Sequence, residues 1–521
     1  MTGVFAFLCW FSSIISLQIM LYLVRSSISD KFSIHRNHFT MAFASTVHAQ
    51  SCSASTEKST KLSIHENLYQ PVPAHLKLEK VVVIHRHGDR TPIERGCGPN
   101  FPERKSMSGK WASTLPSLKT IERIERVGRI VYQSVSEKQF VEMTEAYSGW
   151  DQKEIPYGQL TELGAQQLIR LGEKMRHRYG GNVLPLNIEE AEKHVYCRST
   201  FICRTVHSIR SFLVGLYNID AAESEPTTPS SSNDEAKFTL TARKYHFPTI
   251  HTRPKLEETL YPQVDGRCSV ILDRRVKIEP LRHLSFYDEL STKMRRIFGY
   301  TETNLPWINM QEVLTCHSTY NLLHHFPEVD VNDIDQISDI LAGIWGILYR
   351  EPEMARLGLG RFVSELMADI EEIPHDHHHQ VKQKFNHPVD DIAPTKNKKF
   401  LVYSAHDSTL IPLLCMLRLF DDKWPIYAAS IVIEIARDND EGRYVRVLYN
   451  DRAYSYSRVN KESGHEEKVE WIDYDAFKSL LSQYQISHDE YKQICSRSSP
   501  SSSPPSSPVA SDVAPTFKNN R

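Results

Sequence analysis

The sequence predicts an α/β protein in which a helical subdomain caps a core of sheet and helices. Three observations predict this class. Two short apolar runs, at 78–85 and 398–406, have the length and composition of buried strands. Segments with the apolar spacing of helices alternate with the predicted strands. The stretch from about 258 to 355 indicates helices but no convincing strand after Ile271, so we expect it to form the cap.

The first half of the core is expected to begin with the strand at 78–85, whose unbroken apolar side chains are typical of a fully buried, parallel strand. A loop rich in Gly and Pro should follow, from Thr91 to about Pro116. A helix is predicted next, with Thr161 as its N-cap and Gly180–Gly181 at its end. Its buried face is marked by an apolar stripe formed by Leu160, Leu163, Leu168, Leu171 and Met175.

Further elements alternate in the same way. A strand end at 195–197 is expected to lead into a helix capped by Ser199. "YHFPTIHT" looks like another strand, and "ASIVIEIA" and "RYVRVLYN" alternate strongly enough to be sheet strands. Helices are predicted in the cap and just after it, at 288–298, 310–325, 334–349 and 359–370.

These patterns divide the chain into four parts. Residues 1–75 are interpreted as a hydrophobic targeting or anchor segment with a linker, and 258–355 as the cap. The core is discontinuous, formed by 76–257 and 356–495. The tail at 496–521 is low in complexity and rich in Ser and Pro, so we expect it to be disordered, like the insertion Ala221–Lys237.

Composition excludes some classes of function. The 62 Lys and Arg nearly balance the 64 Asp and Glu, so the chain has no global basic field for nucleic acid and any anion site must be local. The nine cysteines form no CxxC pair, and their odd number argues against a complete disulfide framework. Several lie in apolar runs, which is typical of buried free thiols. No Asn-x-Ser/Thr sequon occurs, which disfavours a glycosylated secretory product.

The N-terminal stretch Val4–Val24 is long and apolar enough to span a bilayer or to act as a targeting signal. It has no basic residue before it, unlike a secretory signal. The first 29 residues contain no acid, a feature shared with organellar import signals. We therefore expect targeting to a membrane-bounded compartment, with membrane association through residues 4–24 as an open alternative to cleavage.

The strongest chemical signal is "RHGDRTP", which directly follows the first apolar run. Gly88 allows the backbone to turn tightly after His87. Arg86 and Arg90 can each grip two oxygens of a phosphate dianion, and such an anion would offset the repulsion between the crowded cations. A positioned imidazole between them can attack phosphorus. The motif therefore indicates a phosphate site at the end of a strand.

Two further motifs have similar positions. In "YSAHDSTL", His406 can donate to a phosphate oxygen, and a protonated Asp407 could give its proton to a departing alkoxide. In "RSTFICRT", Arg198 and Arg204 lie near the start of a predicted helix, whose N-terminus favours anions. Because ligands of α/β sheets bind beyond the carboxyl ends of the strands, we expect these motifs to form one site.

Together these motifs, in this order, resemble the histidine acid phosphatase branch of the phosphoglycerate-mutase-like superfamily over about 76 to 495. The resemblance implies a sandwich with a central mixed sheet flanked by helices, plus a helical cap. It implies that His87 is the nucleophile, forming a covalent phosphohistidine, and that Asp407 is the proton donor. The phosphoryl group would be bound by Arg86, Arg90, Arg204 and His406.

Other polar residues in and near these motifs are given structural roles. Arg198 is interpreted as orienting its turn, not as binding phosphate. No cofactor and no metal are expected. "HDHHH" (375–379) could bind a metal but is interpreted as a solvated loop. Asp89 could be an auxiliary acid, although a hydrogen-bonded structural role is favoured. The oligomeric state is not indicated.

Other stretches, such as "HTRPKLEETLYP" and "YQISHDEYKQIC", are similar to the lysophosphatidic acid phosphatases of this family, which are mitochondrial. The resemblance implies hydrolysis of lysophosphatidic acid to monoacylglycerol and phosphate, and a mitochondrial location. Asp89 departs from that subgroup, and "RTVHS" follows the prostatic pattern.

Several alternatives therefore stay open. One is a broad-specificity acid phosphatase of prostatic or lysosomal type, acting on phosphotyrosine or small monoesters. A second is a mutase or phytase-like relative, and a third is a non-catalytic, membrane-tethered phospholipid-binding protein. For the location, the alternative is the endoplasmic reticulum and secretory route, or a membrane anchor.

Overall fold

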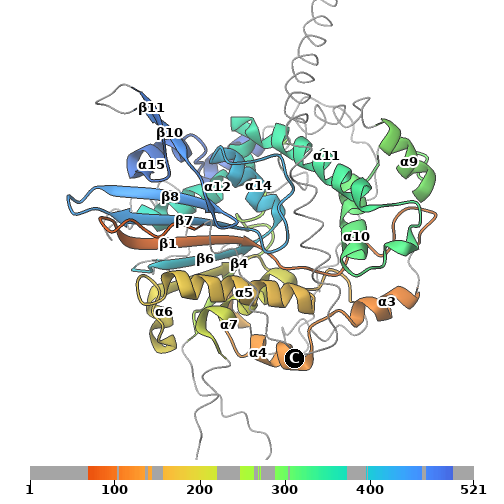
Figure 1. Ribbon diagram of the computed structural model, residues 1–521, viewed down its shortest axis with the longest axis horizontal. Helices are drawn as coiled ribbons and strands as arrows, with labels where there is room; N and C mark the ends of the chain where they lie inside the picture. The colour runs from red at the N-terminus through yellow and green to blue at the C-terminus, as the bar shows by residue number, and fades with distance from the viewer. Residues whose placement is uncertain are drawn as a thin grey trace, which may run out of the picture. The chain divides into compact units, whose positions relative to one another are not determined.

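A mixed sheet of ten strands forms the centre of the part of the chain that the computed structural model describes (Figure 1). Its strand order is β12-β8-β7-β1-β6-β4-β5-β2-β3, and β9 pairs with β8. The described residues are 69–102, 105–134, 139–143, 156–219, 247–262, 268, 270–271, 288–302, 305–371, 395, 397–459 and 465–496. The predicted α/β class with a central mixed sheet flanked by helices is confirmed.

Three parallel strands at the centre of the sheet bring the three predicted motifs together at the carboxyl ends of the strands. They are β1 (Lys77–Arg86), β6 (Phe400–Ala405) and β4 (Val195–Ser199), with β6 between the other two. The register pairs Arg86 with Ala405 and Ser199 with Ser404, so the three carboxyl ends are level. Segments more than 300 residues apart in sequence therefore emerge side by side.

Alternate side chains of β1 enter different cores, which explains its unbroken apolar run. Val81 and Val83 pack in the cluster that contains α5 (Glu162–Tyr179) and α7 (Cys203–Tyr217). Val82 and Ile84 pack in the cluster on the other face, with α12 (Pro352–Glu371) and α14 (Asp407–Met416). Figure 1 shows these two helical layers on opposite faces of the sheet. At about 25 cal/mol per Å² of apolar area buried, this two-sided burial is the main term that fixes the strand.

A third apolar cluster joins the helices of the predicted cap: α9 (Asp288–Phe298), α10 (Trp307–Thr319) and α11 (Val331–Arg350). Asp330 caps α11 by accepting from the backbone N–H of Asp333. The same α11 also packs against α12 and α14 of the core. The division of the chain into core and cap stays a prediction.

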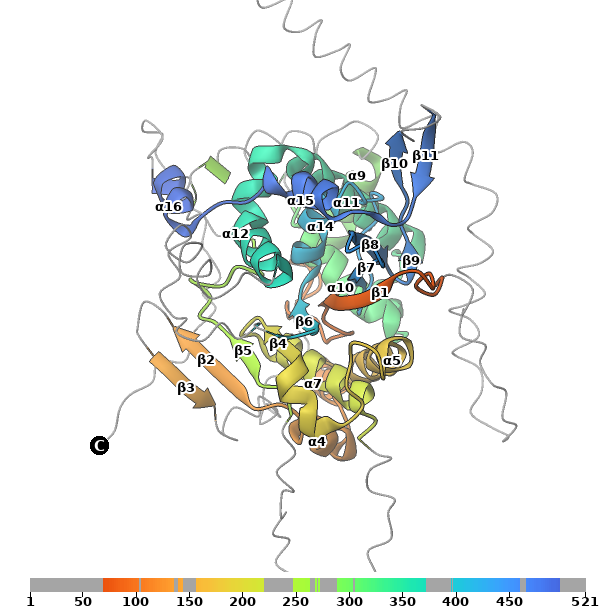
Figure 2. The same ribbon diagram turned by 90° about the vertical axis from the view of Figure 1, so that its left-hand side faces the viewer.

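The remaining elements complete both edges of the sheet. Beyond β5 (Ile250–Thr252), the strands β2 (Ile130–Ser134) and β3 (Gln139–Met143) form one edge (Figure 2). At the other end lie β7 (Ser430–Arg437) and β8 (Arg443–Tyr449). The other described elements are α3 (Lys105–Ala112), α4 (Leu118–Glu125), η2 (Ile188–Glu190), α6 (Ala191–His194), η6 (Leu323–His325), β9 (Arg452–Ala453), β10 (Tyr456–Val459), β11 (Glu466–Val469), β12 (Ile472–Asp473), α15 (Tyr474–Ser482) and α16 (His488–Ser496).

Three local predictions were wrong. Ser199 does not cap a helix: it is the last residue of β4, paired with Ser404, and α7 begins only at Cys203. The stretch 91–116 is not all loop, because α3 forms there and buries Trp111 against Tyr157 and Cys316. Leu163, predicted in the buried apolar stripe of α5, is instead exposed. By contrast, the predicted buried, parallel strand is confirmed in β1, which is parallel to β6, although its other neighbour, β7, runs antiparallel. Thr161 also caps α5, accepting from the N–H of Gly164.

The cysteines are mostly free thiols in the described part of the chain. Cys268 and Cys495 form a disulfide, whereas Cys97, Cys197, Cys316 and Cys415 have free thiols. Among the described residues, no helix has both the length and the apolarity needed to cross a bilayer. The stretch Val4–Val24, the insertion 221–237, the loop 375–379 and the Ser/Pro tail lie outside the described residues.

Candidate active site

His87 lies just beyond the end of β1, and its ring is held by the backbone of the next residue, Gly88. Its Nδ1 is 2.8 Å from the Gly88 carbonyl oxygen, which can only accept, so Nδ1 carries the hydrogen when the ring is neutral. The lone pair is then on Nε2. The backbone N–H of His87 donates to the Ala405 carbonyl at the end of β6, 3.0 Å away. The ring is therefore oriented with a nucleophilic nitrogen free.

Gly88 is required by a close approach between two segments. A Cβ at this position would lie 2.3 Å from the carbonyl oxygen of Gly164 in α5. The N–H of Gly88 also donates to Ser208 Oγ of α7, 3.1 Å away. The turn that presents His87 is thus clamped between two helices, which no larger residue would permit.

His87 is kept neutral by its surroundings. Burial lowers the pKa of this imidazole well below its usual value, and the charges of Arg204, Arg86 and Arg90 lower it further, as does His406. Both effects have the same sign, because each disfavours the imidazolium. A neutral, nucleophilic ring therefore persists into acidic solution.

The three arginines of the site differ in their partners. Arg86 forms a salt bridge with Asp407 at 2.6 Å and donates to the Pro425 carbonyl at 2.5 Å. Arg90 pairs with Glu312 of α10 at 2.7 Å. Arg204, in the first turn of α7, forms no ion pair within the described part of the chain. Burial and the charge of Arg90 lower its pKa to about 10. This unpaired guanidinium gives the site a positive surplus for an anion.

His406 and Asp407 follow β6 directly and begin α14. His406 Nε2 is 3.0 Å from Thr200 Oγ1, and its ring centre is 5.5 Å from that of His87. Burial alone would raise the pKa of the Asp407 carboxyl, but Arg86, His406 and Arg90 outweigh it and the pKa is lowered. Asp407 is therefore ionised in the free protein.

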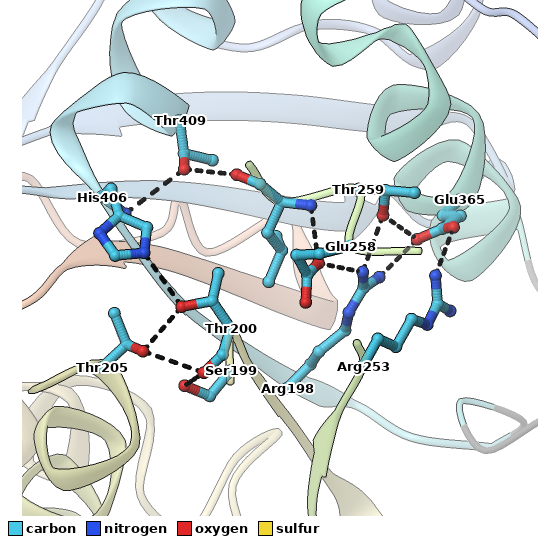
Figure 3. Close-up of polar contacts among 11 residues, drawn as sticks. Arg198, Ser199, Thr200, Thr205, Arg253, Glu258, Thr259, Glu365, His406 and Thr409 are labelled. Carbon is cyan, nitrogen blue, oxygen red and sulfur yellow. Dashed lines mark hydrogen bonds and ion pairs between the residues drawn. The ribbon is translucent and has the colours of Figure 1, made fainter. Parts of the chain in front are cut away.

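Arg198 lies outside this anion site, inside a neutral cluster of two arginines and two carboxylates (Figure 3). It donates to Glu258 at 2.6 Å and to Thr259 at 2.7 Å, and it pairs with Glu365. Arg253 pairs with the other oxygen of Glu365 at 2.7 Å. Because its guanidinium is already paired with Glu258 and Glu365, Arg198 is not available to bind a phosphate. This agrees with the interpretation from the sequence.

Asp89 is fully buried beside the site, and its carboxylate accepts hydrogen bonds from Thr161 and Tyr320, both at 2.6 Å. Burial raises its pKa. These bonds tie the turn after His87 to α5 and to the end of α10. The favoured interpretation of Asp89 as a hydrogen-bonded structural residue agrees with this arrangement.

Sequence reasoning missed several residues that contact the site. Glu312 binds Arg90, and the ring of Tyr427 lies 4.3 Å from the Arg86 guanidinium and 5.8 Å from the His87 ring. Neither position carries a local signal, because a glutamate in a helix and a tyrosine in a turn are ordinary. Thr200 belongs to the quoted "RST" motif, so its place in the motif was the only available hint.

No group of three or more His, Cys, Asp or Glu side chains able to hold a metal ion occurs among the described residues. The predicted absence of a metal and of a cofactor stays a prediction.

Comparison with known proteins identifies the class. The chain matches the family model of the histidine phosphatase superfamily (branch 2) over residues 77–450. It therefore belongs to that family and is a histidine acid phosphatase, a phosphoric monoester hydrolase. The family assignment agrees with the sequence resemblance.

The relatives include two kinds of phosphatase. Lysophosphatidic acid phosphatase type 6 of Pongo abelii is 26% identical over 66% of this chain and 70% of its own length. Prostatic acid phosphatase of Rattus norvegicus is 24% identical over 72% of this chain and 79% of its own. Among solved structures, the apo form of Hafnia alvei phytase is 14% identical with a TM-score of 0.45, covering 80% of this chain and 98% of that one.

Proposed function

We propose that the protein hydrolyses phosphate monoesters through a covalent phosphohistidine on His87. The orientation of the ring carries this proposal: Nδ1 donates to the Gly88 carbonyl, 2.8 Å away, so Nε2 can attack phosphorus. The P–O bond to the alcohol breaks as the Nε2–P bond forms. Water then attacks the phosphohistidine, releasing inorganic phosphate and restoring the imidazole.

The guanidinium groups stabilise the transferring phosphoryl group. Its charge spreads over three equatorial oxygens, which Arg86, Arg90, Arg204 and His406 would bind. Arg86 and Arg90 form direct salt bridges with carboxylates, whereas Arg204 forms none among the described residues and interacts with Glu312 and Asp407 only from a longer distance. Arg204 is therefore the group whose electrostatic interaction with phosphate is least offset in the free protein.

Asp407 supplies the proton for the leaving alkoxide. In the free protein its pKa is lowered and it is ionised. A bound phosphate dianion adds negative charge beside it and competes for Arg86, and both effects raise the carboxyl pKa. Substrate binding therefore favours the protonated form that general acid catalysis needs, more strongly as the solution becomes acidic.

Trapping of the intermediate tests this mechanism. Wild-type protein quenched in acid-free denaturant during turnover of a ³²P-labelled monoester should carry label on His87, with a burst of alcohol equal to the enzyme concentration. H87A should show neither. The matched control is H251Q, which removes a half-buried histidine of β5. The pKa of His251 is also lowered, to about 4. Label on any other residue would contradict the assignment of the nucleophile.

We further propose lysophosphatidic acid as the substrate. The similarity in sequence to lysophosphatidic acid phosphatases supports this substrate. The similarity to prostatic acid phosphatases supports the broad-specificity alternative instead. A panel of lysophosphatidate, glycerophosphate, a phosphotyrosine peptide and inositol hexakisphosphate tests it. The highest kcat/KM is expected for lysophosphatidate, and glycerophosphate, which lacks only the acyl chain, is the matched control. Equal rates on the peptide would favour the broad-specificity alternative.

A mitochondrial location, directed by residues 4–24, is proposed on the resemblance alone. The Cys268–Cys495 disulfide instead favours an oxidising compartment, such as the endoplasmic reticulum of the alternative proposal. Fractionation of cells that express the full chain with a C-terminal tag distinguishes the two. Carbonate extraction of the membranes then shows whether the protein is anchored.

A further inference from the structure

His406 is contacted by a threonine pair that lies outside the set of phosphate-binding residues. Thr200 follows β4, and Thr205 lies in the first turn of α7. The two hydroxyl oxygens are 2.7 Å apart, and Thr200 Oγ1 is 3.0 Å from His406 Nε2. All three side chains are buried, with at most 3% of each residue exposed. Figure 3 shows them as one continuous line of hydrogen bonds.

The direction of these hydrogen bonds follows from counting hydrogens. Thr205 Oγ1 also lies 2.8 Å from the Ile202 carbonyl and 3.0 Å from the Thr200 carbonyl, which can only accept. In one arrangement the Thr205 hydroxyl donates to a carbonyl, and the Thr205 oxygen accepts from the Thr200 hydroxyl. The Thr200 oxygen then accepts from His406 Nε2–H. This direction makes three hydrogen bonds, whereas the reverse makes two. The buried groups are better satisfied by the first.

A neutral His406 ring carries one hydrogen, on either Nδ1 or Nε2. Burial lowers the pKa of His406 well below its usual value, with Arg204 acting in the same direction, so the ring is neutral. The tautomer of a neutral histidine is set by the hydrogen bond that one ring nitrogen makes. A hydroxyl that accepts at Nε2 keeps the hydrogen there.

We propose that Thr200 and Thr205 are positioning residues that hold His406 as the Nε2–H tautomer, ready to donate to a phosphoryl oxygen. In the free protein His406 Nε2–H donates to Thr200 Oγ1. A phosphate oxygen that reaches the ring replaces Thr200 Oγ1 as the acceptor and finds the hydrogen already on Nε2. The inference rests on the proposed function, because it assigns a way in which the phosphate-binding role of His406 is prepared.

The neutral arginine cluster anchors the two segments that carry this arrangement. Arg198 lies two residues before Thr200 and binds Glu258. Glu258 in turn accepts from the backbone N–H of Leu260, 2.8 Å away. The Leu260 carbonyl accepts from Thr409 Oγ1 at 2.5 Å, and Thr409 also contacts the backbone N–H of His406 at 3.3 Å. His406 is therefore held at its ring and at its backbone by one connected network.

A double-mutant cycle tests the proposal with para-nitrophenyl phosphate. T200V keeps the side-chain shape and removes the hydroxyl, and it should lower kcat/KM about 5- to 10-fold, the effect of one lost hydrogen bond. T200S should restore most of the activity. In an H406Q background T200V should cause no further loss, because Thr200 acts only through His406. T205V should act in the same direction with a smaller loss.

The matched control is T252V. Thr252 is equally buried and donates to the Val131 carbonyl at 3.1 Å, in the edge part of the sheet. T252V should leave kcat/KM unchanged. A similar melting temperature for T200V and T252V would show that the loss of activity is not a loss of folding.

Additive losses of T200V and H406Q, or an unimpaired T200V, would overturn this inference while leaving the phosphatase mechanism intact. A wild-type protein that releases no phosphate would instead overturn the proposed function. The two failures are therefore distinguishable within the same set of assays.

Discussion

Two arginines from one short motif, Arg198 and Arg204, have opposite electrostatic environments. Arg198 lies in a cluster of two guanidiniums and two carboxylates, whose ionised charges cancel. These carboxylates outweigh the effect of burial and raise its pKa well above the usual value. Arg204 forms no ion pair within the described residues, and burial with the neighbouring Arg90 lowers its pKa to about 10.

These two environments distinguish a structural arginine from an anion-binding one. A paired, buried guanidinium stabilises the fold around it only while its partners are present. An unpaired one raises the free energy of the empty site, and that cost is recovered when an anion binds. We therefore expect substitution of the two residues to affect different measured quantities.

The largest effect is expected from R204M. Removing a guanidinium that stabilises transition-state charge should lower kcat/KM about 10³-fold, roughly 4 kcal/mol. The free energy of unfolding should not fall, because burial and the repulsion from Arg90 outweigh the attraction of Glu312 and Asp407 for this guanidinium. Inorganic phosphate should raise the melting temperature of the wild type but hardly that of R204M. A destabilised R204M with normal phosphate binding would contradict the comparison.

A smaller effect, on stability, is expected from R198M. It leaves Glu258 and Glu365 with one guanidinium between them, so the free energy of unfolding should fall by about 3–4 kcal/mol, measured by urea denaturation. The kcat/KM of the folded fraction should fall only about 10-fold, since Arg198 is linked to His406 only indirectly, through Glu258, Leu260 and Thr409. The opposite result, a stable protein without activity, would place Arg198 in the anion site.

D407N is expected to have a substrate-dependent effect. Loss of the proton donor should slow an alkyl phosphate about 100-fold. It should slow para-nitrophenyl phosphate, whose leaving group needs no proton, by less than about 10-fold. The fall of kcat with rising pH should also disappear, because that fall reports deprotonation of Asp407. Equal slowing of both substrates would exclude Asp407 as the acid.

The stability of the protein is also expected to depend on pH through His85. His85 is buried, with its pKa lowered to about 4, so below pH about 6.5 the unfolded chain binds a proton that the folded chain does not. Stability therefore falls as the pH falls from about 6.5 toward 4, by up to about 1.4 kcal/mol per pH unit for this histidine. H85N, which keeps a donor for the Arg86 carbonyl, should show a shallower slope in urea denaturation. An unchanged slope would mean that His85 is protonated in the folded protein.

Much of the fold was predictable because its signals are local. The unbroken apolar residues of β1 and β6 reflect burial on both faces of the sheet, and Thr161 caps α5 with its own hydroxyl. The Ser199 cap failed for a non-local reason: pairing with Ser404, about 200 residues away, extended β4 through the residue that was expected to begin the helix. The helix α3 was missed because its buried tryptophan packs on α10, not on neighbours in sequence.

Local sequence patterns identify the residues that have the chemistry of a phosphate site: an imidazole flanked by arginines just before Gly88, and a histidine–aspartate pair after another strand. The charge and the orientation of these side chains depend instead on the fold. The order of β1, β6 and β4 placed the three motifs at one end of the strands and brought Glu312 into an ion pair with Arg90. Arg204 has no ion-pair partner among the described residues, and Glu312 and Asp407 act on it only from a longer distance. Electrostatic environment depends on distances between segments far apart in the chain, and a linear pattern does not contain those distances.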